Sequence, residues 1–160
     1  MNTNTSGIRN TAVGRSALLS NTTGVRNTSL GYESMRANSV GNDKVALGFN
    51  ALKGNTSASR NTALGAYSME TNTTGCYNTA IGWSSLLYNT TGVCNVAVSL
   101  NAMRANTTGF RNTAIGKGAL ESNTAGTRNV AIVERSLRAS TAGDNTAVGT
   151  YSLYANTTGT

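Results

Sequence analysis

The chain repeats one pattern about every 17 residues, and two positions of each repeat are always apolar. We call the residues that share a position in successive repeats a column. Each repeat opens with a short word such as Asn-Thr-Ala. If its first residue is position 1, position 4 is always Val, Leu or Ile and position 9 is always Leu or Met. The repeats begin at Asn10, Asn27, Lys44, Asn61, Asn78, Asn95, Asn112, Asn129 and, one residue early, Asn145. A fixed short period of this kind is typical of solenoids and other stacked repeats.

Both apolar columns are predicted to form the core of the stack. A single coil cannot bury these side chains alone, and only an identical neighbour offers a matching surface. We therefore expect both columns to point inward. The position 4 column is Val13, Leu30, Leu47, Leu64, Ile81, Val98, Ile115, Ile132 and Val148. The position 9 column is Leu18, Met35, Leu52, Met69, Leu86, Met103, Leu120, Leu137 and Leu153.

Each repeat predicts one short strand and one tighter segment. Positions 2 to 4 are short and rich in β-branched residues, which favours a strand. Positions 6 to 11 hold no Val or Ile but many Ala, Leu, Met, Ser and charged residues, which favours a helical or 3₁₀ turn; an irregular second strand is the alternative. Asn at position 12 and Gly at position 15 predict corners. The predicted fold is a parallel β-solenoid, or β-roll, of about nine coils, forming a single domain over residues 1–160.

The polar and small columns predict contacts within and between stacks. Asn at positions 1 and 12 should form ladders whose amides hydrogen-bond from coil to coil. Position 3 is Ala except at Ser29, and position 5 is Gly except at Ser99 and Val133. If position 4 points inward, these small residues point outward, because successive side chains of a strand alternate. We therefore expect another backbone to approach that face closely, as in a trimer.

The composition argues against an enzyme. The chain has no His and only 12% charged residues, and its six carboxylates fall mostly in different columns and on distant coils. It therefore lacks the convergent acid, base or nucleophile groups that catalysis needs, and it shows no metal-site spacing. No cofactor is expected. The net charge of +7 is compatible with anionic partners but specifies none, and no nucleic-acid partner is expected.

Three further features are candidates for function. A basic column at position 17 is either a stripe for sulfated or phosphorylated sugars or a solvated edge: Arg9, Arg26, Arg60, Arg111 and Arg128. Aromatic residues at the variable positions either stack on sugar rings or pack between neighbouring solenoids. Cys76 and Cys94 lie on adjacent coils in neighbouring columns, which makes them a candidate disulfide if their side chains face one another.

The words NTAIG, NTAVG and NTALG, each followed by an Ala-Leu or Ser-Leu step and NTTG, resemble the repeats of bacteriophage tail fibres and the head repeats of trimeric autotransporter adhesins. The resemblance covers nearly the whole chain. It implies a parallel β-roll, usually a homotrimer, that serves as a shaft on a cell or virion surface. We expect an extracellular or surface location, although no Sec signal is visible after Met1 and no apolar run is long enough for a membrane span.

The leading hypothesis is a non-enzymatic structural or adhesive fibre module that self-associates laterally, as a homotrimer, or end to end, as a head-to-tail filament. The filament is expected because neither terminal repeat reads as a polar cap. One alternative is a glycan-binding module that uses the arginine column and exposed aromatics, with a cell-surface glycan as partner. Another is an ice-binding solenoid with a threonine column at position 13: Thr22, Thr56, Thr73, Thr90, Thr107, Thr124, Thr141 and Thr157.

Overall fold

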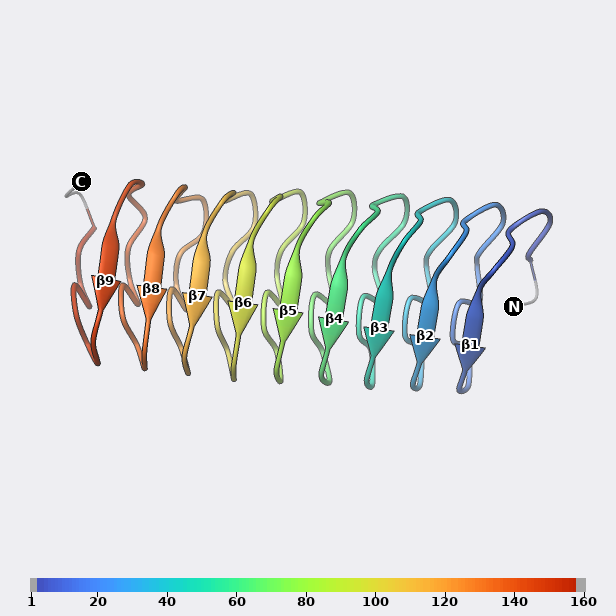
Figure 1. Ribbon diagram of the computed structural model, residues 1–160, viewed down its shortest axis with the longest axis horizontal. Helices are drawn as coiled ribbons and strands as arrows, with labels where there is room; N and C mark the ends of the chain where they lie inside the picture. The colour runs from blue at the N-terminus through green and yellow to red at the C-terminus, as the bar shows by residue number, and fades with distance from the viewer. Residues whose placement is uncertain (1–2, 158–160) are drawn as a thin grey trace.

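The computed structural model describes residues 3–157 as a row of short parallel strands, one per repeat (Figure 1). Nine strands form one sheet in chain order. Each strand pairs in register with the strand one full coil, about 17 residues, further along the chain. The predicted parallel β-solenoid is therefore confirmed. The strands are β1 Thr11–Val13, β2 Thr28–Leu30, β3 Val45–Leu47, β4 Thr62–Leu64, β5 Thr79–Ile81, β6 Val96–Val98, β7 Thr113–Ile115, β8 Val130–Ile132 and β9 Thr146–Val148.

The segment after each strand is a series of tight turns, and the predicted helical or 3₁₀ turn is wrong: the described residues contain neither. The cause is a left-handed backbone at positions 7 and 9, as at Ser84 (φ 54°) and Leu86 (φ 49°). A right-handed helix needs consecutive residues with φ near −60°, so two left-handed residues so close together prevent it. Each coil instead closes turns such as Asn89 N–H to the Leu86 carbonyl, 3.1 Å.

Backbone hydrogen bonds between coils continue outside the strands. The Leu86 N–H donates to the Ala102 carbonyl at 3.0 Å, and the Thr90 N–H donates to the Thr107 carbonyl at 3.0 Å. Left-handed conformations of bulky residues cost about 1–3 kcal/mol each, and they persist where the surroundings over-determine them. This pairing, repeated in coil after coil, provides that constraint.

Position 9 forms the core as predicted, whereas the inward orientation predicted for position 4 is wrong. Leu86 is 0% exposed and the position 9 residues from Leu18 to Leu137 are all buried; only Leu153, beyond which no further coil is described, is 48% exposed. Ala at position 3 fills the interior beside them, as Ala80 does. The misplaced column is Val13, Leu30, Leu47, Leu64, Ile81, Val98, Ile115, Ile132 and Val148, each partly or largely exposed.

The physical reason for this reversal is the width of the coil. A turn of about 17 residues encloses room for one large side chain, and position 9 supplies it. Strand side chains alternate, so either position 3 or positions 2 and 4 can face that interior. Ala beside Leu or Met fits, whereas a second large aliphatic would overpack the coil. The small side chains at position 3 are therefore internal, and the predicted approach of another backbone over them is wrong as well.

The two predicted asparagine ladders are present. At position 12, Asn89 Nδ2 donates to Asn72 Oδ1 at 2.7 Å, and Asn106 repeats the contact to Asn89 at 2.7 Å. At position 1, both the backbone N–H (2.9 Å) and the side-chain Nδ2 (3.1 Å) of Asn95 donate to Asn78 Oδ1. These buried amides hydrogen-bond to their equivalents one coil away. Each ladder is therefore stable only if successive repeats keep Asn at the same position.

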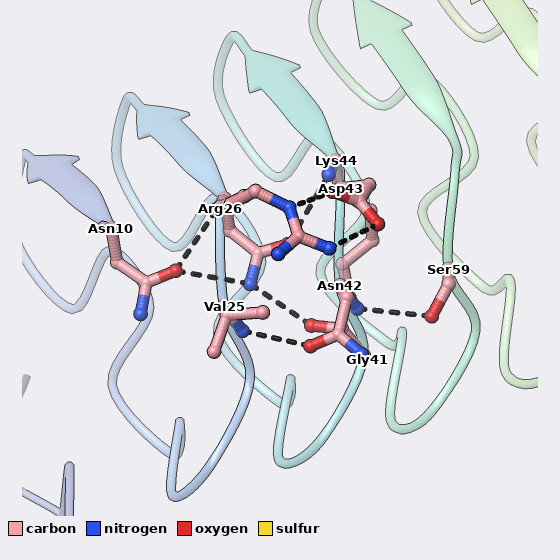
Figure 2. A network of polar contacts seen from close by, with 9 residues as sticks. Asn10, Val25, Arg26, Gly41, Asn42, Asp43, Lys44 and Ser59 are labelled. Atoms are coloured by element: carbon pink, nitrogen blue, oxygen red, sulfur yellow. Dashed lines mark hydrogen bonds and ion pairs between the residues drawn. The ribbon is translucent and has the colours of Figure 1, made fainter. Parts of the chain in front are cut away.

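Lys44 interrupts the asparagine ladder at position 1. It occupies position 1 of its coil and is 1% exposed. Its backbone N–H keeps the ladder contact to Asn27 Oδ1 at 3.3 Å, near the Asn10 contacts drawn in Figure 2. Its Nζ crosses the interior and donates to the side-chain oxygens of Asn38 and Asn55, the latter at 2.6 Å. A lysine offers no acceptor, so the ladder cannot continue from its side chain to Asn61.

Candidate functional site: the outer sheet face

The outward side chains at positions 2 and 4 of β1–β9 form a continuous surface, which we call the outer sheet face. Position 4 supplies a row of Val, Leu and Ile, and position 2 supplies Thr with Val at three strands. Ile81, at the centre of the row, is 37% exposed. Exposed aliphatics aligned over nine strands make a patch of the kind that marks an interaction surface. Its position 2 members are Thr11, Thr28, Val45, Thr62, Thr79, Val96, Thr113, Val130 and Thr146.

An aromatic ladder borders the face just after the strands. Tyr32 and Phe49 stack with centroids 5.1 Å apart and planes 8° from parallel. Phe49 meets Tyr67 edge-on at 5.3 Å, and Tyr67 meets Trp83 edge-on at 6.1 Å. Trp83 remains 50% exposed. The ladder thus widens the apolar surface along β2–β5.

The predicted arginine stripe borders the face just before the strands, but other residues interrupt it. Asp43 and Asp144 occupy the same column and pair with arginines of the preceding coils. Figure 2 shows the fork of Arg26 against the Asp43 carboxylate, with Nη2 3.0 Å from Oδ2. This hydrogen bond lowers the pKa of Asp43, and the equivalent bond from Arg128 lowers the pKa of Asp144.

The remaining arginines of the stripe do not converge either. Arg60 lies 5.2 Å from the ring centroid of Tyr77 and donates to its hydroxyl. Arg111 lies 5.9 Å from the ring centroid of Phe110. Arg9 flanks β1 at the start of the column. The column therefore carries both signs of charge, and several of its arginines contact other residues of the chain. This favours a solvated edge over a uniform basic stripe for anionic sugars.

The arginines and the stacked aromatics lie at opposite ends of the strands, so the structure does not join them into one glycan site. Within the ladder, the rings of Tyr32 and Phe49 face one another along the stack. A sugar ring stacks on an exposed aromatic face, and Tyr32 and Phe49 each turn one face toward the other ring instead of outward. The geometry favours an apolar contact surface over a carbohydrate platform.

The threonine column at position 13 serves the stack itself. The hydroxyl of Thr73 donates to the carbonyl of Thr90 at 3.0 Å, and that of Thr90 donates to the carbonyl of Thr107 at 3.1 Å. The same contact joins Thr107 to Thr124 at 3.0 Å. These hydroxyl hydrogens are directed at the protein backbone, which leaves them unavailable as donors to surface water.

Both cysteines are free, so the candidate disulfide is not formed in this structure. The Cys76 thiol belongs to a short ladder at position 16, in which the side chains of Asn42, Ser59 and Cys76 accept from the backbone of the preceding coil. Asn42 Oδ1 accepts from Val25 N–H at 2.8 Å, and Cys76 Sγ accepts from Ser59 N–H at 3.3 Å. Cys94 is exposed on the next column.

The described residues offer little else that could act as a site. Residues 3–157 contain no pocket, and none of their Cys, Asp or Glu side chains form a group able to hold a metal ion. No helix in that range is long and apolar enough to span a bilayer. The outer sheet face and its two borders are therefore the surface from which a function must be inferred.

Sequence reasoning missed the outer sheet face because it assigned every apolar column to the core. A signal for the true orientation was present: Ala at position 3 varies less than position 4, as expected of a side chain confined within a narrow coil. The burial of Lys44 had no comparable signal, since lysine is almost never fully buried.

Comparisons with known proteins add no assignment. No family model matches the chain, and neither a curated protein nor a solved structure matches it. The functional inference consequently depends on the surface described above.

Proposed function

We propose that this chain is a structural module of a surface fibre, exposed on a cell or virion, that self-associates laterally through its outer sheet face. The observation that carries the proposal is the unbroken aliphatic row on that face. Buried Ala and Leu or Met already close the core, and the row is not part of it. An apolar row kept outside the core is explained by a partner surface.

The size of the face supports association. Nine strands at ~4.8 Å spacing extend roughly 40 Å, and each strand with its two borders spans roughly 20 Å, which gives on the order of 800 Å² per copy. That is about the area each partner contributes to a stable protein interface. The centre of the face is apolar and charged residues lie at its borders, which is the usual anatomy of such an interface.

The ladder architecture suits a shaft. Each coil contacts only its neighbours, so the stack can grow in length without changing its cross-section. Fibre stiffness would come from the repeated backbone pairing and asparagine ladders. The NTAxG resemblance to tail fibres and adhesin heads supports the same role. End-to-end stacking through β1 and β9, each paired on one side only among the described strands, is the alternative mode of association.

Sedimentation analysis tests the proposal. In the test variant, Leu47, Leu64 and Ile81 are replaced by Ser. The control variant carries Ser at Ile8, Val40 and Tyr88, which are exposed and apolar but lie off the face. The parent and the control should form defined multimers, and the face variant should be a folded monomer. A parent that stays monomeric at every concentration would refute lateral association, and filaments in electron micrographs of the face variant would show end-to-end contact instead.

A further inference from the structure

The charges beside the outer sheet face differ between its two borders. Just before the strands, the column runs from Arg9 beside β1 through Asp43 beside β3 and Arg111 beside β7 to Asp144 beside β9. Just after the strands, the column is aromatic or aliphatic at β2–β6. It is charged at Arg15, Lys117 and Glu134, beside β1, β7 and β8. A second copy laid on the face must match this pattern with itself.

In a parallel, in-register copy, the two stacks run in the same direction and each strand faces its own equivalent. The border before the strands of one chain then lies opposite the border after the strands of the other. This holds for a two-fold pair and for a three-fold bundle along the stack. Arg9 then meets Arg15 at β1, and Arg111 meets Lys117 at β7. Only at β8 do opposite charges meet, Arg128 with Glu134. Like charges placed opposite one another select against that arrangement.

In an antiparallel copy, the two stacks run in opposite directions, and a two-fold axis lies between the faces along β5. Each border then lies opposite the same border of the second copy, in reversed strand order. β1 then lies over β9, so that Arg9 meets Asp144 of the second copy. β3 lies over β7, so that Asp43 meets Arg111. Both contacts are attractive and, by symmetry, each occurs twice.

The antiparallel arrangement leaves one like-charged contact, against the two attractive ones. β2 lies over β8, which brings Arg26 near Arg128 of the second copy. Asp43 and Asp144 pair with these arginines within each chain, so each carboxylate is shared between an arginine of its own chain and one of the second copy. No like-charged pair meets along the border after the strands in this arrangement.

The centre of the antiparallel pair would be aromatic and apolar. Trp83, Ile81 and Tyr77 all belong to or flank β5, next to the axis, so each would lie near its own equivalent. Aromatic anchors at the centre and charges at the rim are the arrangement in which interface residues contribute most.

We infer that the partner of the outer sheet face is a second copy of this chain, bound face to face and antiparallel, with Asp43 opposite Arg111 and Arg9 opposite Asp144. This inference rests on the proposed lateral association and specifies its geometry. It predicts a closed two-fold pair as the unit from which any larger fibre is built.

Site-directed cross-linking tests the orientation. In a background with Cys76→Ser and Cys94→Ser, one variant carries Thr28→Cys on β2 and the other Val130→Cys on β8. Both changes lie at exposed or half-exposed strand positions, and unchanged circular dichroism would verify the fold. The two variants, one labelled with ¹⁵N, are refolded together from urea and treated with a short bismaleimide. β2 and β8 are six strands apart, roughly 29 Å at ~4.8 Å per strand, so the reagent distinguishes the registers.

An antiparallel pair should give mainly the mixed product, Thr28→Cys linked to Val130→Cys, with little self-linking of either variant. Self-linked products without the mixed product would overturn the antiparallel arrangement while leaving lateral association intact. A multimer by mass with neither product would place the contact outside the face and overturn both. A monomer by mass that gives no cross-link would also overturn both.

Discussion

Replacing Lys44 by Asn should restore the position 1 ladder and remove a buried cation. Burial lowers the pKa of the Lys44 amine from its ordinary 10.5 to about 7. In the unfolded chain the amine stays protonated to about pH 10.5, whereas the folded state releases the proton above about pH 7. The parent is therefore penalised most at and below pH 7, and the penalty fades as the pH rises toward 10.5.

The size of this effect follows from the same pKa values. Lowering a pKa from 10.5 to about 7 is equivalent to roughly 5 kcal/mol of lost stability at neutral pH. An Asn at this position also supplies the side-chain acceptor that the Asn61 N–H lacks beside a lysine. The variant should thus unfold at higher urea than the parent, by the largest margin near pH 7.

Urea unfolding of both proteins at pH 7 and pH 9 is the assay. The advantage of Lys44→Asn should shrink by roughly 2 kcal/mol between these pH values, because the slope of the parent's stability rises from half its full value at the pKa toward about 1.4 kcal/mol per pH unit above it. Lys117→Asn is the matched control: it makes the same substitution at a half-exposed lysine, which pairs with Glu134 at the surface. An advantage of Lys44→Asn that is equal at both pH values would refute the reasoning.

Three further outcomes are expected. Val133→Gly should raise the melting temperature, because Val133 holds φ 86° in a column otherwise occupied mainly by glycine. Relief of about 1–3 kcal/mol of strain exceeds the cost of a flexible glycine. The reverse change, Gly116→Val, should lower the melting temperature. Asn89→Ala should cost about 1–3 kcal/mol in urea unfolding, because it removes the donor to the Asn72 oxygen and the acceptor of the Asn106 amide. The parent should show no thermal hysteresis in an ice-growth assay, and activity there would contradict the assignment of the position 13 hydroxyls to the stack.

The period and the asparagine ladders were predictable because they depend on identity between repeats, which the sequence states directly. The turn segment was not. Leu and Met at position 9 give no local sign of a left-handed backbone, since that conformation is imposed by pairing with the next coil, as at Leu86. Helix propensity at positions 6 to 11 was overridden by this tertiary constraint.

The outer sheet face was mispredicted for a different reason. A three-residue strand shows alternation but does not say which side is inside, and hydrophobicity alone pointed to position 4. Coil width decides the question, and it becomes apparent only when Leu86 and Ala80 are seen sharing one narrow interior. The arginine column was found by spacing, yet its pairing with Asp43 and Asp144 weakened the glycan interpretation.

The most direct test of this account is thermal unfolding of two matched substitutions, Ile81→Asp and Leu86→Asp, at a dilution where the parent is monomeric. Both replace a large aliphatic by a carboxylate in the same repeat, but Ile81 lies on the outer sheet face and Leu86 is fully buried. Leu86→Asp should abolish or strongly lower the cooperative transition, because it buries an unpaired charge. Ile81→Asp should melt within a few degrees of the parent. A stable Leu86→Asp beside an unfolded Ile81→Asp would contradict the assignment of the two columns.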